Sequence, residues 1–593
     1  MSAAAMYSAA LQHQKEMVDS IQKYATRAIV HFGEALLRGV EKASVSLPRM
    51  LTLWLDGTVF LGGLLSTTAG KLDGTVSAAL VEMNNRIREF VLSTVRPVIP
   101  PAVVMTALPQ LLSRLGHPVA AVRTVLTDIV LHLLNHFPQQ CLWLVLPMAL
   151  SKEGPKEVVE TQIIAPFAGN PRNEPVLRHS KFICDTLLTI CNCSASLFPK
   201  EKGLTQLSPV QQITPMLPAA KFIVPVLSNL TPDIRATSNG AVFPTAPCFD
   251  RFDDRVVVMR SLQKPKRIWV HTNDGREMSF LCKAKDEPRK DIRMMEVAAL
   301  MNSFFLSDPE AKRKRFSLRR YSITALSDDC AVIEWLNDTT PLAKVAMECY
   351  ALDRSGVHIS SVKKWVTLVD EKKISKMELF TKYILPEAPP VMHQWLDRTF
   401  ASNQSWYEAR KLFTQSTALW SIAGHIVGLG DRHAENLMID MERGELLHVD
   451  FACMFDKGEK LEVPEQVRFR LTQNLTDVMG VLGAYGPFQA TCEVALRCEM
   501  KNKSAVMSII ETLLHEPLIE WRRQNSRSHS SSGPKQLMER VARRLDGFLD
   551  LYSVPAQRDT LSLNVESQVA KLIHHSSDLN NLSQMYIWWM AWI

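Results

Sequence analysis

Apolar side chains recur every three or four residues over most of the first 200 residues, which is the period of amphipathic helices. The pattern runs from about residue 9 to residue 92, is interrupted by prolines near residue 100, and resumes over 103–151 and 176–190. Two or more stacked helical pairs are therefore expected here, although no repeat of fixed length is visible. Taken alone, such helices predict a scaffold.

Short β runs replace the helical pattern from Phe252 onward, after a proline-rich stretch over 208–247. One helix, Pro288 to about Phe305, interrupts these runs, and Asn273-Asp274-Gly275 predicts a hairpin turn between two of them. A mostly helical region is expected from about Pro341 to Trp521. The predicted strands are Arg255–Leu262, Arg267–His271, Met278–Cys282, Ser322–Leu326 and Cys330–Leu336.

The last part of the chain combines a low-complexity stretch with an aromatic end. Ser526–Pro534 is rich in serine and predicts a loop, and Val565–Ile593 predicts a short helix that ends in large apolar residues. Burial against the preceding region is expected, because large aromatic side chains are seldom left in water; a membrane or partner contact is the alternative. The four aromatic residues are Tyr586, Trp588, Trp589 and Trp592.

Composition is typical of a folded chain with about three to five domains. Of 593 residues, 46% are hydrophobic and 22% are charged, and the net charge of +7 does not by itself imply a nucleic-acid or membrane partner. Eleven cysteines without a Cys-x-x-Cys pair indicate free thiols. No signal-peptide pattern is visible, and Cys141–Leu150, the most apolar stretch, is too short to span a bilayer. A soluble intracellular protein is expected.

The strongest chemical signal is the run Gly428–Asn436 followed by His448-Val449-Asp450-Phe451. Phosphoryl transfer needs a carboxylate that orients the attacking hydroxyl, together with a neutral and an anionic oxygen ligand for Mg²⁺. Asp431, Asn436 and Asp450 supply these groups in that order. Ordinary protein kinases carry His-Arg-Asp and Asp-Phe-Gly at the equivalent points, whereas this chain reads Asp-Arg-His and Asp-Phe-Ala.

Asp-Arg-His-x-x-Asn followed by His-x-Asp-Phe resembles the phosphatidylinositol 3-kinase-related protein kinase (PIKK) family, within a superfamily of lipid and protein kinases. The resemblance implies an α+β fold: a two-lobed kinase with a small β-rich lobe and a large helical lobe, preceded by all-α FAT-type helical repeats. It also implies ATP and Mg²⁺ as cofactors, with Mn²⁺ as a possible substitute. Asp431 would be the base, His433 would stabilise the transferring phosphoryl group, Asn436 and Asp450 would bind the metal, and Arg432 would brace the loop through a carboxylate.

In the small lobe the family resemblance implies a further set of nucleotide-binding residues. Lys283 follows a β run and would reach the phosphates, held by Asp291 or, as a weaker candidate, Glu296. The glycine-free turn Ser261–Lys266 would be the phosphate loop, with Ser261 and Gln263 as contacts. Glu334, Trp335 and Leu336 would form the hinge that binds adenine, and Tyr321, Met438 and Val449 would line the apolar wall.

The charge of the acceptor segment bears on the substrate. Between Phe451 and Gln466 four acidic residues stand against Lys457 and Lys460. This balance would repel a polyanionic inositol head group and therefore favours a protein hydroxyl as acceptor. A phosphoinositide kinase and a catalytically silent scaffold remain the alternatives. The acidic residues are Asp456, Glu459, Glu462 and Glu465.

Several further segments resemble the ATR-type checkpoint kinases within this family. They are Ser261–Lys266, Arg289–Glu296 and the tail Asn581–Ile593, which is similar to a FATC element. Pro48–Asp56 resembles the end of a FAT helical domain, and Pro138–Trp143 lies in the helical link that follows it. The resemblance implies nuclear phosphorylation of Ser or Thr before Gln in the DNA-damage and replication-stress checkpoint. It also implies an ATR-interacting partner, activators and a protein that coats single-stranded DNA. Direct nucleic-acid binding through the basic cluster 312–315 is less favoured than a solvated loop.

The sequence departs from the family pattern at three positions, Arg468, Trp588 and Ala591. The expected domain order follows from the segments above. The family's long N-terminal solenoid is missing from this sequence, so the chain is expected to be a C-terminal portion and its partner contacts are uncertain. We expect part of a FAT domain at 1–95, a helical linker at 96–247, a small lobe at 248–336, a large lobe at 337–522, a regulatory linker at 523–560 and FATC at 561–593.

Overall fold

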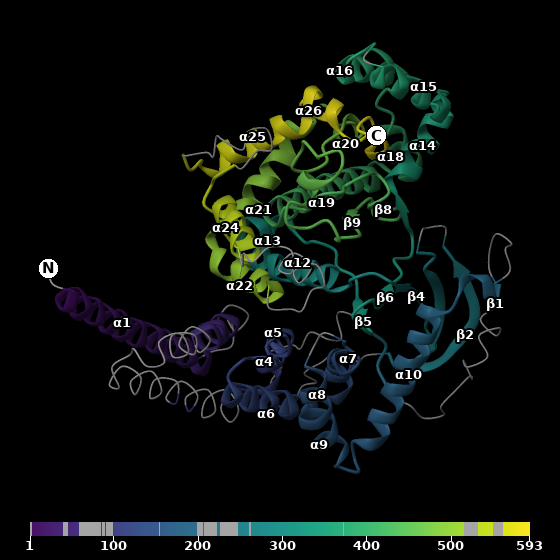
Figure 1. Ribbon diagram of the computed structural model, residues 1–593. Helices are drawn as coiled ribbons and strands as arrows, with labels where there is room; N and C mark the ends of the chain where they lie inside the picture. Colours follow the sequence, from purple (N-terminus) through teal and green to yellow (C-terminus); the bar gives the residue numbers. More distant parts are fainter. Residues whose placement is uncertain are drawn as a thin grey trace. The chain divides into compact units, whose positions relative to one another are not determined.

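A computed structural model describes the chain in two compact units (Figure 1). The first unit comprises 1–292, 321–335 and 508–527, and the second comprises 293–320, 336–507 and 528–593. The chain therefore passes from the first unit to the second between Trp335 and Leu336, within the predicted hinge. Within these units the described residues are 3–38, 46–57, 85, 89, 99–152, 155–198, 205–206, 222–225, 247–259, 263–371, 373–514, 532–549 and 561–593.

Helices make up the N-terminal part of the first unit, as the apolar spacing predicts. Prolines open several of them, where the missing N–H has no partner to lose. A further helical stretch covers 46–57. The named helices are α1 (Ala3–Arg38), α4 (Pro101–Met105), α5 (Leu108–Ser113), α6 (Ala120–His136), α7 (Pro138–Ala149), α8 (Lys156–Val159), η1 (Glu160–Ile164), α9 (Ala165–Ala168), α10 (Glu174–Asn192) and η2 (Ala195–Leu197).

An antiparallel sheet follows in the same unit, with strand order β1-β2-β3-β4-β6-β5. The predicted hairpin joins β3 to β4: Gly275 has a φ of +81°, and its N–H donates to the carbonyl of Thr272 at 2.9 Å. All five predicted strands are present, although the first begins earlier and ends earlier than predicted. The strands are β1 (Thr205–Gln206), β2 (Phe249–Val258), β3 (Lys266–Thr272), β4 (Glu277–Ala284), β5 (Ile323–Ala325) and β6 (Cys330–Glu334).

The helices and the sheet of the first unit share one apolar core. Trp54, Trp143 and Ile268 are all buried in it. The indole N–H of Trp143 donates to the carbonyl of Ile223 at 3.0 Å, so this large side chain is satisfied within the core. Lys266, at the start of β3, is buried too, and its ammonium group donates to the carbonyl of Cys191 in α10 at 2.7 Å. The strand is thereby fixed against this helix.

The second unit is mostly helical, and its longest helix, α19 (Asn403–Val427), lies at its core. Its small sheet has the order β7-β8-β9. The remaining elements are α13 (Pro309–Lys314), β7 (Thr339–Pro341), α14 (Leu342–Asp353), α15 (Ile359–Asp370), α16 (Lys376–Glu378), η3 (Leu379–Ile384), α17 (Leu385–Glu387), α18 (His393–Thr399), β8 (Leu437–Asp440), β9 (Leu446–His448), η4 (Lys457–Lys460), α20 (Gln473–Met479), η5 (Ala484–Phe488), α21 (Gln489–Lys501), α24 (Ser532–Leu545), α25 (Val565–Ser577), α26 (Leu579–Gln584) and η6 (Ile587–Trp589), with α12 (Arg289–Ser307) and α22 (Lys503–Leu514) divided between the units.

Helix α19 brings the chain to the small sheet. It begins at Ser402 with a capping box, in which the Ser402 and Ser405 side chains each bind the other's main chain. It ends at Gly428, whose φ of +65° favours glycine and turns the chain out of the helix. The hydroxyl of Ser416 accepts the N–H of Leu446 at 2.9 Å, so the helix also fixes strand β9. The segment between α19 and β9 is therefore anchored at both ends.

The aromatic tail is only partly buried, so the prediction of burial is half right. Trp589 and Trp592 are buried, whereas Tyr586 is 53% and Trp588 41% exposed. Trp588 and Trp589 are neighbours in a short 3₁₀ helix, and neighbouring side chains there point in directions about a third of a turn apart. All eleven cysteines are free thiols. None of the helices in the described ranges is long and apolar enough to cross a membrane.

Candidate active site

The segment from the end of α19 to the residues directly after β9, called the catalytic loop below, brings the three predicted residues Asp431, Asn436 and Asp450 together. The Asn436 amide nitrogen donates to the carbonyl of Asp431 at 2.9 Å. The N–H of Val449 donates to the carbonyl of Asn436 at 3.1 Å, so the two proposed metal ligands come from adjacent segments of the β8–β9 hairpin. Asp431 and Asp450 both have left-handed backbones, with φ of 58° and 60°. Such strain in non-glycine residues is typical of functional sites.

Arg432 braces this loop, but through main-chain carbonyls rather than through the expected carboxylate. Its guanidinium donates to the carbonyls of Gly430 at 2.9 Å and Val449 at 2.8 Å, and also to that of Asp450. The side chain is 3% exposed, and burial lowers its pKa. One buried arginine therefore fixes both ends of the catalytic loop.

His433 lies beside the proposed base. Its Nε2 is 3.9 Å from Oδ1 of Asp431. Its Nδ1 accepts the N–H of Glu435 at 3.2 Å, which places the ring proton on Nε2 in the neutral form. Burial lowers the pKa of His433, and burial raises the pKa of Asp431. The pair can therefore present an N–H donor next to a carboxylate.

His448 of the same motif has a structural role. It is buried, its ring stacks on Trp420 with centroids 5.2 Å apart, and burial lowers its pKa well below the ordinary value. Phe451, from the same motif, stacks on the same indole, with centroids 5.8 Å apart. These aromatic contacts hold the segment that carries Asp450 against α19.

The acidic residues of the acceptor segment are largely neutralised within the protein, which overturns the physical argument made from their number. Asp456 is buried and accepts hydrogen bonds from Arg468 at 3.1 Å and from Arg544. Glu459 accepts from Arg540 at 3.0 Å, and Glu465 is 6% exposed. Glu462 is the exposed carboxylate among the four. The number of acidic residues in this segment therefore does not describe the negative charge that an acceptor would meet.

Glu465 is a residue of this site that no motif marked. Its Oε1 accepts the main-chain N–H of Asp431 at 2.9 Å, across 34 residues of sequence. Burial raises the pKa of its carboxyl to about 7. Its only sequence signal is its place in the segment after Asp450, where acidic residues had been counted together as an acceptor-facing set.

In the first unit, Lys283 lies at the end of β4 and pairs with Asp286, three residues further on. Asp286 was not among the predicted partners. Asp291, the predicted partner, is buried in the first turn of α12, and the weaker candidate Glu296 pairs with Arg293. The side-chain amide of Gln263 donates to the carbonyl of Lys285 at 3.4 Å. Ser261 lies outside the described residues.

The predicted hinge is an ordered continuation of β6. The N–H of Glu334 donates to the carbonyl of Ser322 at 2.8 Å, and the N–H of Trp335 donates to the carbonyl of Ser279 at 3.0 Å. The guanidinium of Arg267 lies 4.4 Å from the centre of the Trp335 ring, a cation–π contact that orients the indole. In the second unit, the Leu336 carbonyl accepts the Thr339 hydroxyl at 2.9 Å.

The predicted apolar wall divides between the two units. Tyr321 is buried in the first unit, at 3% exposure. Met438 and Val449 are half-buried in the second unit, on β8 and directly after β9. Half-buried apolar side chains next to Asn436 and Asp450 are suited to contact a ligand held by those residues.

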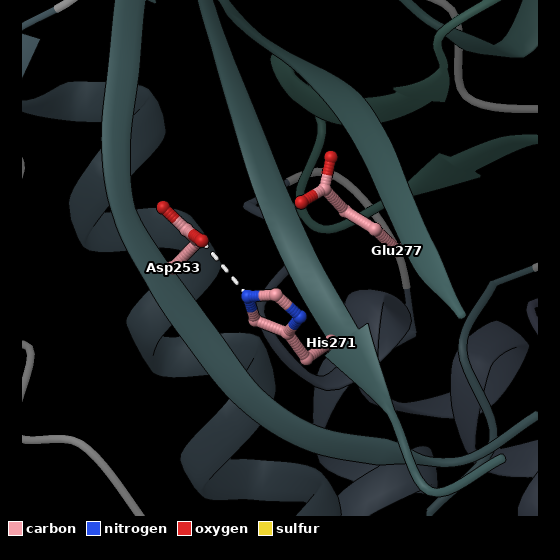
Figure 2. Close-up of side chains that lie close together, drawn as sticks. All are labelled: Asp253, His271 and Glu277. Atoms are coloured by element: carbon pink, nitrogen blue, oxygen red, sulfur yellow. Dashed lines mark hydrogen bonds and ion pairs between the residues drawn. The ribbon is translucent and has the colours of Figure 1, made fainter. Parts of the chain in front are cut away.

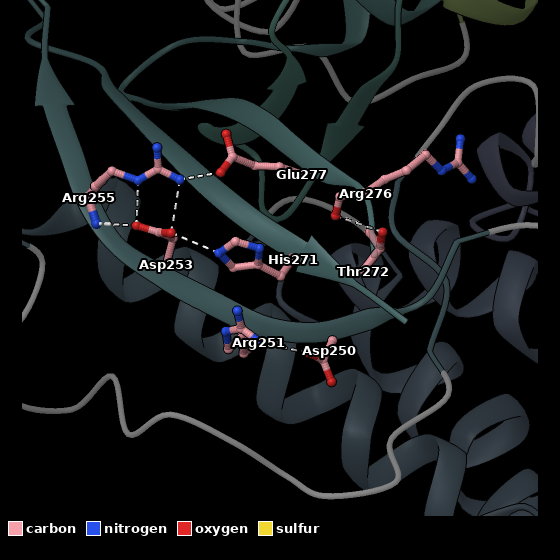
Figure 3. A network of polar contacts seen from close by, with 8 residues as sticks. All are labelled: Asp250, Arg251, Asp253, Arg255, His271, Thr272, Arg276 and Glu277. Carbon is pink, nitrogen blue, oxygen red and sulfur yellow. Dashed lines mark hydrogen bonds and ion pairs between the residues drawn. The ribbon is translucent and has the colours of Figure 1, made fainter. Parts of the chain in front are cut away.

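A second polar cluster, on strands β2, β3 and β4, has the residue types of a metal site (Figure 2). Ligand atoms of Asp253, His271 and Glu277 lie within 4.8 Å of one another. However, Arg255 already binds Asp253 with two nitrogens at 2.8 and 2.9 Å and also binds Glu277 (Figure 3). The guanidinium supplies the positive charge that a cation would bring, so this cluster fits an ion-pair network better than a metal centre.

Comparisons with known proteins agree with this geometry. Residues 277–523 match the family phosphatidylinositol 3- and 4-kinase, 86–181 match the ATR-like serine/threonine-protein kinase HEAT repeats, and 562–593 match the FATC domain. The chain is 34% identical to serine/threonine-protein kinase ATR of Arabidopsis thaliana, over 96% of this chain and 21% of the relative. It is 30% identical to protein kinase rad3 of Schizosaccharomyces pombe, over 96% of this chain and 24% of the relative. It thus spans about a fifth to a quarter of these relatives.

The solved structure of the FAT and kinase domain of CtTel1 has the same fold. It aligns with a TM-score of 0.73 and 20% sequence identity, over 98% of this chain and 41% of that chain. The fold and the catalytic loop define a kinase domain of the phosphatidylinositol 3- and 4-kinase class, joined to ATR-like helical repeats and a FATC domain. The chain thus carries a phosphatidylinositol 3- and 4-kinase domain and a FATC domain, and it is similar over most of its length to ATR and rad3 kinases, in agreement with the predicted fold class and family.

Proposed function

We propose that the chain is an ATP-dependent serine/threonine protein kinase of ATR type. The observation that carries the proposal is the catalytic loop, in which Arg432 fixes the main chain around Asp431, Asn436 and Asp450. A silent scaffold has no physical need for a strained loop that gathers two carboxylates and an amide. The similarity to ATR and rad3 kinases supports the same activity.

The donor set fits a magnesium ion. The Asn436 amide is oriented by its hydrogen bond to Asp431, which leaves Oδ1 as the atom that meets a cation, and Asp450 adds an anionic oxygen. Mn²⁺ prefers the same hard oxygen donors and is a possible substitute. When bound, such a metal neutralises charge on the phosphates of ATP.

The chain's own residues would then position the reacting groups. The Asp431 carboxylate orients the acceptor hydroxyl and takes its proton, which is typically worth about 10²–10⁴-fold in rate. His433 donates its Nε2 proton toward the transferring phosphoryl oxygen. Lys283 binds the α- and β-phosphates and is held by Asp291, and Ser261 and Gln263 of the phosphate loop contact the phosphate oxygens.

For the base of ATP we propose the hinge and the apolar side chains. Main-chain groups of Glu334 and Leu336 bond the adenine edge, and Trp335 packs on its face. The cation–π contact with Arg267 supports this role, because it orients the indole in advance. Tyr321, Met438 and Val449 complete the apolar surroundings.

The acceptor and the cellular role are proposed from the relatives. We propose Ser or Thr before Gln as acceptor, in a nuclear DNA-damage and replication-stress checkpoint, with an ATR-interacting partner and activators. These contacts belong to proteins several times longer than this chain, so they are proposals for this portion. Direct nucleic-acid binding is not part of the proposal.

Transfer of ³²P from Mg·ATP tests this function and its acceptor class together. The acceptors are a Ser-Gln peptide, its Ser-Ala counterpart and phosphoinositide vesicles, because the buried acidic residues no longer argue against a lipid. We expect labelling of the Ser-Gln peptide alone. Lipid labelling would identify a phosphoinositide kinase instead, and the absence of transfer to any acceptor, with ATP still bound, would favour a scaffold.

A further inference from the structure

The carboxylate of Glu465 occupies a site built from two separate segments of the second unit. Its Oε1 accepts the N–H of Asp431 at 2.9 Å, and its own N–H donates to the carbonyl of Gly458 at 3.0 Å. The side chain is 6% exposed. The side-chain hydrogen bond thus joins the acceptor segment to the catalytic loop, and the main-chain hydrogen bond holds Glu465 within the acceptor segment.

Glycines on both sides make room for this carboxylate. A Cβ atom at Gly430 or at Gly458 would overlap Oε2 of Glu465. Gly430 is further fixed by its N–H, which donates to the carbonyl of Cys453 at 2.8 Å. The site is therefore shaped for a carboxylate that approaches two main-chain segments closely.

The backbone of Asp431 needs such support. Its φ of 58° is a left-handed conformation that residues with a Cβ rarely adopt. Glu465 binds the N–H on one side of the residue, and the Asn436 amide binds the carbonyl on the other side. Both peptide groups around the proposed base are therefore held by side chains, and the direction of the Asp431 carboxylate follows from them.

We propose that Glu465 is a positioning residue that holds Asp431 in this conformation and so aims its carboxylate at the acceptor hydroxyl. The proposal rests on the kinase function proposed above. In this role Glu465 does not contact the substrate and acts only through Asp431. Its loss should therefore slow the chemical step and leave nucleotide binding unchanged, because misplacing a reacting group by about 1 Å can cost about 10²-fold in rate.

The test compares Glu465→Ala and Glu465→Gln with Glu462→Ala, a carboxylate of the same segment that is exposed. We expect kcat to fall about 10²-fold in Glu465→Ala with KM for ATP within about twofold. Glu465→Gln keeps an oxygen acceptor and should recover kcat to within about tenfold. Glu462→Ala should keep KM for ATP within about twofold, and any change in its kcat should be far smaller than in Glu465→Ala. If Glu465→Ala does not fold, Glu465→Asp, which is too short to reach Asp431, replaces it.

Hydrogen–deuterium exchange of the peptide over 429–436 separates this proposal from the proposed function. Loss of the acceptor should speed exchange of the Asp431 amide in Glu465→Ala and leave it slow in Glu465→Gln and Glu462→Ala. Unchanged exchange in Glu465→Ala, or a raised KM for ATP with unchanged kcat, would overturn the proposal. If the unsubstituted chain transfers no phosphate, the proposed function fails, and the exchange result alone still decides whether Glu465 holds Asp431.

Discussion

The polar cluster on β2–β4 and the catalytic loop contain the same kinds of side chains but use their arginines differently. Arg255 binds the carboxylates of Asp253 and Glu277. Arg432 instead donates to three main-chain carbonyls of its loop. An arginine that pairs with carboxylates cancels the charge that would attract a cation, whereas an arginine that binds carbonyls shapes the loop. The difference indicates why we assign one cluster to an ion-pair network and propose the other as the active site.

The pKa values follow the same division. Hydrogen bonds from Arg255 lower the pKa of Asp253, whereas burial raises the pKa of Asp431. A carboxyl with a lowered pKa is a weak base, and one with a raised pKa accepts a proton more readily. The two regions thus differ in proton affinity as well as in their charge balance.

Replacing each arginine by lysine is expected to give the largest contrast. Lysine cannot reach three carbonyls in a fixed fork, so Arg432→Lys should lower kcat about 10²-fold through misplacement of the loop. Arg255→Lys keeps a charge at a site where the arginine is 37% exposed, and it should leave kcat unchanged. Equal losses of kcat in the two variants, measured by ³²P transfer, would contradict the contrast.

A third carboxyl sharpens the comparison, because it has neither an arginine nor a main-chain partner. Glu499 in α21 is fully buried, and neither oxygen has a hydrogen-bond partner among the described residues. Burial raises its pKa from 4.5 to about 8. The folded protein therefore keeps a proton that the unfolded chain releases above its ordinary pKa, and the free energy of unfolding falls as pH rises through that interval.

We expect this fall to be about 2 kcal/mol between pH 5 and pH 7, measured by chemical denaturation against Glu499→Gln. Glutamine has no proton to lose, so groups that titrate in both proteins cancel in the difference. A pH-independent difference between the two proteins would show that Glu499 is not held protonated.

Removing the arginine of the first cluster is expected to create a metal site with a small effect on stability. Arg255→Met leaves Asp253, His271 and Glu277 with ligand atoms within 4.8 Å of one another, which suits a three-ligand Zn²⁺ site. The loss of unfolding free energy should stay within about 1 kcal/mol, as is usual for partly exposed ion pairs. Calorimetry should detect Zn²⁺ binding to Arg255→Met and none after a further His271→Ala substitution. Zn²⁺ binding by the unsubstituted chain would contradict the account of Arg255.

The sequence predicted those features of the structure that depend on residues close together in the chain. The turn residues Asn273-Asp274-Gly275 between two short β runs predicted the β3–β4 hairpin. Asp431, Asn436 and Asp450 were predicted as site residues from one motif, in which they follow one another at five and fourteen positions. In such local patterns the spacing of the residues along the chain largely determines how they are placed in space.

Contacts between residues far apart in the chain could not be predicted from such local patterns. Asp456 is paired with Arg544 across 88 residues, so its charge could be counted in the sequence but not its neutralisation. Glu465 reaches Asp431 across 34 residues. The ion pair between Lys283 and Asp286 accompanies the left-handed turn at Lys285, a detail of backbone geometry that no motif encodes.

The most direct test of the central claim compares two aspartates, one from each region. Mg²⁺-dependent ³²P transfer to a Ser-Gln peptide is measured for Asp450→Ala and Asp253→Ala. Loss of a metal ligand should lower transfer at least about 10³-fold in Asp450→Ala, because charge neutralisation and positioning carry this chemistry. Asp253→Ala should retain transfer to within about twofold, since its carboxylate serves only the ion-pair network. Transfer that survives in Asp450→Ala, or that is lost equally in Asp253→Ala, would contradict the assignment of the catalytic loop.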